Sequence, residues 1–139
     1  MTKEENKKIY SSGDYRALTD KQRRIFRDVV AELDSRQMLR VTDVPVIASY
    51  ARNAIISRLA CEELEKHGLV LTETDNYRGE KRKENPAFSI YNRAQQAMER
   101  TAALLGLTPT GRKRLKGEEV PPKSDLDTFI EGLNGGPKA

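Results

Sequence analysis

Basic side chains, which can bind phosphate groups, gather in two short runs of the sequence. One run lies around residue 82 and the other between residues 112 and 116. Such side chains contact the backbone of a nucleic acid and supply affinity without reading its bases. Ordinary solvated surface charge explains the same runs equally well, and both interpretations stay open at this point. The predicted nucleic-acid contacts are Lys81, Arg82, Lys83, Arg112, Lys113, Arg114 and Lys116.

Catalytic side chains and metal ligands are scarce. The single histidine, His67, directly precedes Gly68 at the expected end of a helix, where an imidazole N–H serves the terminal carbonyls. The single cysteine, Cys61, allows neither an internal disulfide nor a closed Cys/His zinc site. Three glutamates between residues 62 and 65 point in different directions on a helix. We therefore expect no enzyme activity, no metal and no cofactor.

Charge is unevenly divided along the 139 residues. Residues 1–116 carry 23 basic and 16 acidic side chains, a net charge of +7. Residues 117–139 carry two lysines and five acidic side chains, a net charge of −3. A basic body fits a polyanion partner, and an acidic tail fits a protein partner.

The composition argues against a small enzyme and against a membrane protein. Only 37% of the residues are hydrophobic and there is no Trp, which leaves little material for both a stable core and a deep substrate pocket. No stretch approaches the roughly 20 apolar residues of a membrane helix. We expect a cytoplasmic protein with no membrane partner.

Hydrophobic periodicity predicts four helices. The first spans residues 20–38, after a capping box formed by Thr19 and Gln22. The second runs from a cap at Thr42 or Asp43 to His67. The third covers residues 86–105 and the short fourth one residues 109–116, each with proline at its first position.

The second and third helices are expected to pair as a long antiparallel hairpin. Apolar residues of the third helix recur at alternating spacings of four and three, which is typical of a coiled-coil seam. The seam residues are Ala87, Tyr91, Ala94, Met98, Thr101 and Leu105. Further apolar side chains remain on the flanks, and the first helix or another copy of the chain must cover them. These predicted oligomerisation residues are Ile56, Ala60, Leu64, Phe88, Ile90 and Leu104.

The segments outside these helices divide the chain into three parts. Residues 1–18 are polar and predict a flexible basic arm, followed by a helical core over residues 19–116. Within that core, residues 68–84 are too long for a simple connection, and residues 69–72 resemble a short strand. Residues 117–139 predict a flexible acidic tail with one short amphipathic helix. Its predicted partner-binding residues are Leu126, Phe129, Ile130 and Leu133. The predicted fold is all-α.

Several motifs together resemble the phage terminase small subunit family over residues 19–115. The main ones are the runs NPAFSIYNRA at residues 85–94 and LLGLTPTGRKRL at residues 104–115. Three shorter matches support the same resemblance: Thr42-Asp43 at a helix start, Tyr50-Ala51 within that helix, and the EKHG ending at residues 65–68. One departure is Gly111, where the family pattern usually has Ala or Ser, and glycine weakens a helix by up to roughly 1 kcal/mol.

The resemblance implies a non-catalytic, ring-forming component of the viral DNA-packaging motor. Such a subunit recognises double-stranded viral DNA and regulates the large subunit, which holds the ATPase and the nuclease. On this hypothesis the two basic runs touch the DNA backbone, and the tail helix docks on the large subunit.

Two other functions remain open from the sequence. One is a small dimeric helix-turn-helix transcription regulator, with residues 36–42 as the turn and the front of the second helix as the recognition element. Residues 44–48, Val-Pro-Val-Ile-Ala, offer that regulator almost no base-reading side chains. The other is a structural adaptor that does not contact DNA.

Overall fold

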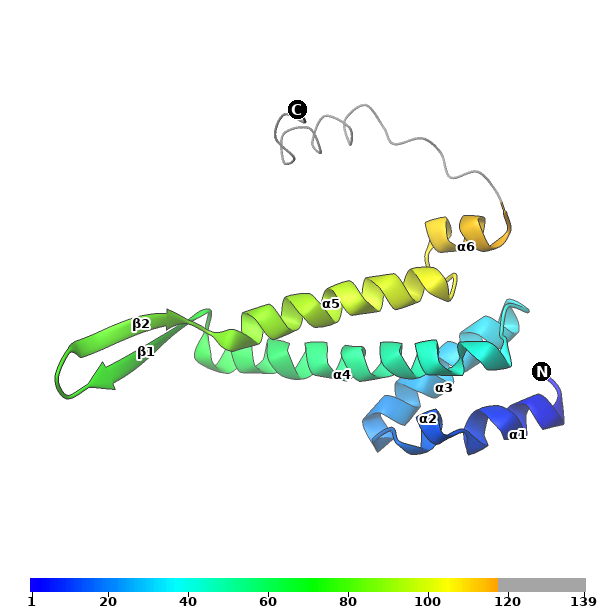
Figure 1. Cartoon of the computed structure of the whole chain (residues 1–139), viewed down its shortest axis with the longest axis horizontal. Coiled ribbons are helices and arrows are strands. Elements are labelled where there is room, and N and C mark those ends of the chain that lie inside the picture. Colours follow the sequence, from blue (N-terminus) through cyan, green and yellow to red (C-terminus); the bar gives the residue numbers. More distant parts are fainter. Residues whose placement is uncertain (118–139) are drawn as a thin grey trace, which may run out of the picture.

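The structure is a computed structural model, and it describes residues 1–117. A long pair of antiparallel helices forms its centre, with shorter helices beside one half and a β-hairpin projecting from one end (Figure 1). The helices are α1 (Lys3–Ser11), α2 (Gly13–Arg16), α3 (Asp20–Ser35), η1 (Val41–Asp43), α4 (Val44–His67), α5 (Pro86–Leu104) and α6 (Pro109–Leu115). The strands are β1 (Val70–Asp75) and β2 (Gly79–Glu84).

Local signals set most of the helix ends. The Thr19 hydroxyl accepts a hydrogen bond from the N–H of Gln22, and the Gln22 side chain accepts one from the N–H of Thr19, which confirms the capping box. Gly68, at φ +75°, ends α4 as predicted. Helix α3 stops at Ser35, three residues earlier than predicted, because Gln37 takes a positive φ of 57° and reverses the chain.

The N-terminal segment differs from the flexible arm that its polar composition predicts. Residues 3–16 form α1 and α2, and Ile9 is fully buried in the core that α3 and α4 build. The Tyr15 ring packs on the Phe26 ring with 5.1 Å between centroids. One buried isoleucine and an aromatic contact thus hold a segment whose other side chains are mostly polar.

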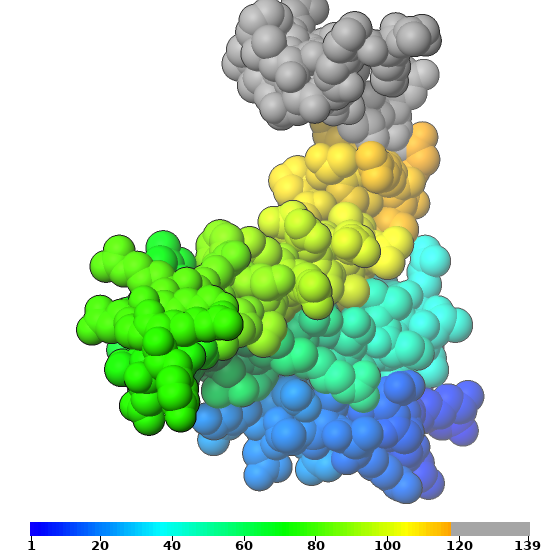
Figure 2. Space-filling view, turned by 60° about the vertical axis from the view of Figure 1, so that its left-hand side comes forward, coloured from blue at the N-terminus to red at the C-terminus, as the bar shows by residue number. Residues whose placement is uncertain are grey.

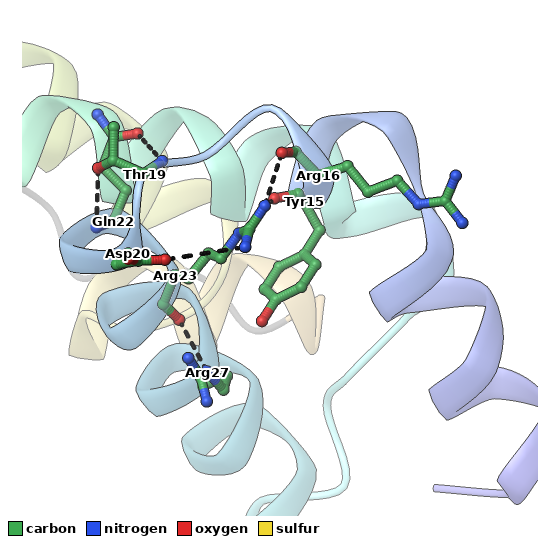
Figure 3. A network of polar contacts seen from close by, with 7 residues as sticks. All are labelled: Tyr15, Arg16, Thr19, Asp20, Gln22, Arg23 and Arg27. Atoms are coloured by element: carbon green, nitrogen blue, oxygen red, sulfur yellow. Dashed lines mark hydrogen bonds and ion pairs between the residues drawn. The ribbon is translucent and has the colours of Figure 1, made fainter.

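Arg23 ties α2 to α3 (Figure 3). Its Nη2 donates to the carbonyl oxygen of Arg16 at 2.8 Å, and its guanidinium lies 5.3 Å from the centroid of the Tyr15 ring. Arg23 therefore acts as a structural cation here, whereas the side chain of Arg16 extends away from this network (Figure 3).

The predicted pairing of the two long helices is confirmed. Ala87, Ala94 and Leu105 of the seam are buried, and the other three seam residues are half-buried. The Nε2 of Gln95 donates to the hydroxyl of Ser57 at 2.8 Å, which fixes the register of α5 against α4. The opposite side of α4 packs against α3 through Val44, Ile47 and other small apolar residues.

The prediction of an all-α fold is wrong, because residues 70–84 form an antiparallel β-hairpin. Val70 pairs with Glu84 at its base and Asp75 with Gly79 at its turn. Gly79 takes φ +76°, and the carboxylate of Asp75 accepts from the N–H of Tyr77 within the turn. The sequence signals only β1, since β2 reads GEKRKE and forms a strand by pairing with β1.

Candidate nucleic-acid interface

More than half of the net positive charge of residues 1–116 lies in α6 and the residue that follows it, Lys116. Residues 109–116 contain four basic and no acidic side chains, out of a net charge of +7 for residues 1–116. Residues 70–84 contain four basic and four acidic side chains, so the hairpin as a whole is neutral. The two predicted DNA-binding runs therefore differ strongly in the field that they present to a polyanion.

Close backbone packing holds α6 against the end of α5. The Thr108 hydroxyl caps α6 by accepting from the N–H of Gly111 at 3.0 Å, as the sequence predicts. Gly111 is buried, and a Cβ at this position would lie 2.4 Å from the carbonyl oxygen of Ala103. Glycine is therefore a packing requirement at residue 111.

The four cations of α6 divide into one structural and three exposed side chains. Arg112 is half-buried, and its Nη1 donates to the carbonyl oxygen of Leu107 at 3.1 Å. The other three, Lys113, Arg114 and Lys116, are exposed, and within residues 1–117 none of them takes part in an ion pair. Exposed cations of this kind can bind phosphate groups.

The connection between α3 and α4 adds a further cation to this end of the molecule. A groove of about 340 Å³ has Arg40, Asp43 and Lys116 among its lining residues, so α6 and this connection share one surface. Burial raises the pKa of the Asp43 carboxyl, and the nearby Arg40 acts in the opposite direction. Arg40 is exposed and was missed by the sequence reasoning, because nothing in the local sequence places it beside α6.

The other predicted cluster lies on the hairpin, beyond the opposite end of the long helices (Figures 1 and 2). Lys83 forms an ion pair with Glu73 of the neighbouring strand. The hydrogen bond from Lys83 and its positive charge, together with the charge of Lys81, hold the pKa of the Glu73 carboxyl below its ordinary value. The structure thus keeps the two clusters apart, and acidic neighbours offset the cations of the hairpin.

The residues predicted to read DNA in a helix-turn-helix regulator lie mostly inside the molecule. Val44, Ile47 and Ala48 at the front of α4 are buried in the core. A recognition helix must expose these positions to the major groove. This arrangement leaves the regulator without a reading surface on the front of α4.

A family model for the small subunit of phage terminase matches residues 23–121, which is well over half of the chain. The chain belongs to the phage terminase small subunit family. No curated protein and no solved structure matches the chain. The match covers most of α3 and all of the later elements, including the hairpin and α6.

No cluster of metal-binding groups accompanies this family match in the described part of the chain. Residues 1–117 contain no group of three or more His, Cys, Asp or Glu side chains placed to hold a metal ion. The Nδ1 of His67 pairs with the Glu63 carboxylate at 2.7 Å, one turn apart on α4. Among the same residues, no helix is both long and apolar enough to cross a membrane.

The predicted oligomerisation residues of this terminase small subunit are mostly on the surface. Ile56, Phe88, Ile90 and Leu104 are exposed, Leu64 is half-buried, and Ala60 is buried at 6% exposure. Ile56, Ala60 and Ile90 line a shallow apolar groove of about 260 Å³ between α4 and α5. The predicted tail contacts Leu126, Phe129, Ile130 and Leu133 lie outside the described residues.

Proposed function

We propose that the chain is a non-catalytic, ring-forming DNA-packaging component that binds double-stranded viral DNA and regulates the large terminase subunit. Family membership supports the packaging role. The single observation that supports DNA contact is the set of exposed cations on α6, with four basic and no acidic side chains over residues 109–116. Lys113, Arg114 and Lys116 are the proposed phosphate contacts, and Arg112 positions the helix.

Self-assembly is the second part of the proposal. The exposed apolar flank of α4 and α5, with Ile56 and Ile90, has no cover within the described chain. Contiguous apolar surface of this kind marks a protein interface. Several copies in a closed ring also multiply the weak phosphate contacts of one copy.

Salt-dependent DNA binding tests the phosphate contacts. The unmodified full chain should bind a DNA duplex. The variant Lys113→Ala/Arg114→Ala/Lys116→Ala should bind the same duplex much more weakly. Each lost phosphate contact lowers the slope of log K against log salt by about 0.9, so the slope should fall by roughly 2.7. The matched control is Lys81→Ala/Arg82→Ala/Lys83→Ala, which removes the same charge from the hairpin.

The two triple variants give opposite results on the two hypotheses. If α6 binds DNA, the control variant keeps most of the affinity and slope when the chains are compared in the same assembly state, which a mass measurement establishes. If the hairpin binds DNA, as the sequence alone also predicts, the control variant loses affinity and the α6 variant keeps it. Equal binding by all three chains would contradict both clusters as contacts.

Regulation of the large subunit by the acidic tail remains a proposal from the sequence. A chain that ends at Lys123 should still assemble but should no longer stimulate the ATPase of the large subunit. Unchanged stimulation would exclude the tail as the docking segment.

A further inference from the structure

Within residues 1–117, no other strand pairs with either long edge of the β-hairpin. The N–H of Asn85 donates to the carbonyl oxygen of Leu69 at 2.8 Å, so residues 69 and 85 form a hydrogen-bonded pair. Such pairs alternate with non-bonded pairs along an antiparallel ladder. From the register, Val70, Thr72 and Thr74 then direct their backbone groups away from β2. Glu80, Arg82 and Glu84 likewise direct theirs away from β1.

Little within the described chain covers or blocks these edges. Apart from the half-buried Leu71, every residue of both strands is exposed, and neither strand contains proline. An isolated two-stranded hairpin is marginally stable in water, and open edges pair readily with another strand. The hairpin also extends beyond the end of α4 and α5, where another chain can reach both of its edges (Figure 1).

The two edges carry opposite charge. Strand β1 contains two acidic and no basic side chains, whereas β2 contains three basic and two acidic ones. Glu73, Asp75, Lys81 and Lys83 lie on one face of the hairpin, because residues opposite each other in the register share a face. Lys83 already pairs with Glu73, while within residues 1–117 Asp75 and Lys81 take part in no ion pair.

We propose that the outer edge of β1 pairs with the outer edge of β2 in a second copy of the chain. This contact joins acidic to basic strands, repeats the cross-strand pairing seen between Glu73 and Lys83, and continues the antiparallel order. It joins two different edges, so each copy keeps one edge free for the next copy, and a closed ring satisfies all of them. Pairing of two β1 edges places acidic strands side by side and leaves the β2 edges open.

The inference rests on the proposed self-assembly and adds the hairpin as an interface. The apolar flank of α4 and α5 and the hairpin edges are separate surfaces. Either one can therefore prove not to be an interface between copies while the other still is. The hairpin is then an assembly element, in line with its neutral charge, and α6 remains the surface for DNA.

Cross-linking between two differently labelled chains tests the pairing. One chain carries Thr74→Cys and the other Glu80→Cys, both with Cys61→Ala, so that the charges of Glu73, Asp75 and Lys81 remain. Residues 74 and 80 face each other near the turn of one hairpin. In a ring of identical copies both residues therefore lie near the hairpin tips, offset only by the stagger of neighbouring strands. A short bismaleimide should link unlike chains in the mixed sample in higher yield than like chains, because like residues of neighbouring copies lie two strand spacings, roughly 9.6 Å, apart.

The alternatives give different products. A higher yield of dimers from the Thr74→Cys chain alone than from the mixed sample would indicate pairing of two β1 edges. A higher yield from the Glu80→Cys chain alone would indicate pairing of two β2 edges. Either result, or an assembled mixture with no linked chains, would overturn the inference while leaving self-assembly intact. A chain that stays monomeric by mass measurement would instead contradict the proposed ring itself.

Hydrogen exchange of the unmodified chain covers the case in which the cysteine variants do not fold. Amides of residues 70, 72 and 74 should exchange rapidly in the dilute chain and slowly in the assembled chain. Rapid exchange of these amides in the assembled state would also overturn the inference.

Discussion

Helix α6 and the β-hairpin both carry consecutive basic side chains, yet the hairpin as a whole is neutral and only α6 keeps a net positive charge. On α6 the four cations have no acidic neighbour over residues 109–116. On the hairpin an equal number of acidic side chains offsets the cations, and one of them, Glu73, pairs directly with Lys83. A basic run therefore predicts a phosphate-binding surface only after its neighbours across the fold are counted.

The helical core and the hairpin should contribute very differently to the stability of the chain. Replacing the buried Phe26 by Ala should lower the free energy of unfolding by about 3–5 kcal/mol, because its ring packs on Tyr10 and Tyr15 inside the core. Replacing Tyr77, which is 96% exposed at the turn of the hairpin, should change it by less than about 0.5 kcal/mol. Urea unfolding measures both values, and a large loss for Tyr77→Ala would contradict an independent hairpin.

Gly111→Ala should displace α6 without a change of charge. The new Cβ would lie 2.4 Å from the carbonyl oxygen of Ala103, which is main chain and cannot rotate away. We expect a loss of about 1–3 kcal/mol in the free energy of unfolding together with weaker DNA binding. Gly13→Ala is the control, since nothing lies within 4 Å of its added Cβ. Normal DNA binding by Gly111→Ala would show that the position of α6 is unimportant.

Asn85 joins the hairpin to α5. Its replacement should lower the free energy of unfolding by less than the replacement of Phe26 or Gly111. Its buried side chain accepts from the N–H of Ala87 at 3.0 Å and donates to the carbonyl oxygen of Gly68 at 2.9 Å. Asn85→Ala should cost about 1–2 kcal/mol of stability, since it removes the helix cap. Asn85→Asp keeps the acceptor and loses the donor. Its free energy of unfolding in urea should therefore lie between those of the unmodified chain and of Asn85→Ala. Equal stability of all three would exclude this joint as a stabilising contact.

The ion pair on the hairpin should be visible in its pH dependence. In the folded chain the pKa of the Glu73 carboxyl lies below its ordinary value. The ion pair therefore stabilises the hairpin fully above the pKa of an unperturbed glutamate. This stabilisation is lost as the pH falls through the lowered pKa of Glu73. NMR titration of the Glu73 carboxyl should therefore show a lowered pKa, and Lys83→Met should return it toward the ordinary value. A titration unaffected by this substitution would mean that Lys83 does not hold the carboxylate.

Local sequence signals were sufficient to predict α4 and α5, with their ends, and the start of α3. The cap at Thr19, the stop at Gly68 and the proline start of α5 each act over a few residues, and the structure confirms them. The seam of α5 follows from its own periodicity in the same way.

Contacts between distant segments account for what the sequence did not reveal. Strand β2 exists through its register with β1, and the same register places Glu73 beside Lys83. Ile9 is one apolar residue in a polar segment, so its burial under α3 and α4 left no periodic signal. The position of Arg40 near α6 likewise depends on how α3, α4 and α5 pack together.

Hydrogen exchange of the full chain with and without duplex DNA tests most directly whether α6, and not the hairpin, is the DNA surface. We expect slower exchange over residues 109–116 when DNA is added, with residues 70–84 unchanged at constant assembly state. Slower exchange confined to residues 70–84 would contradict it.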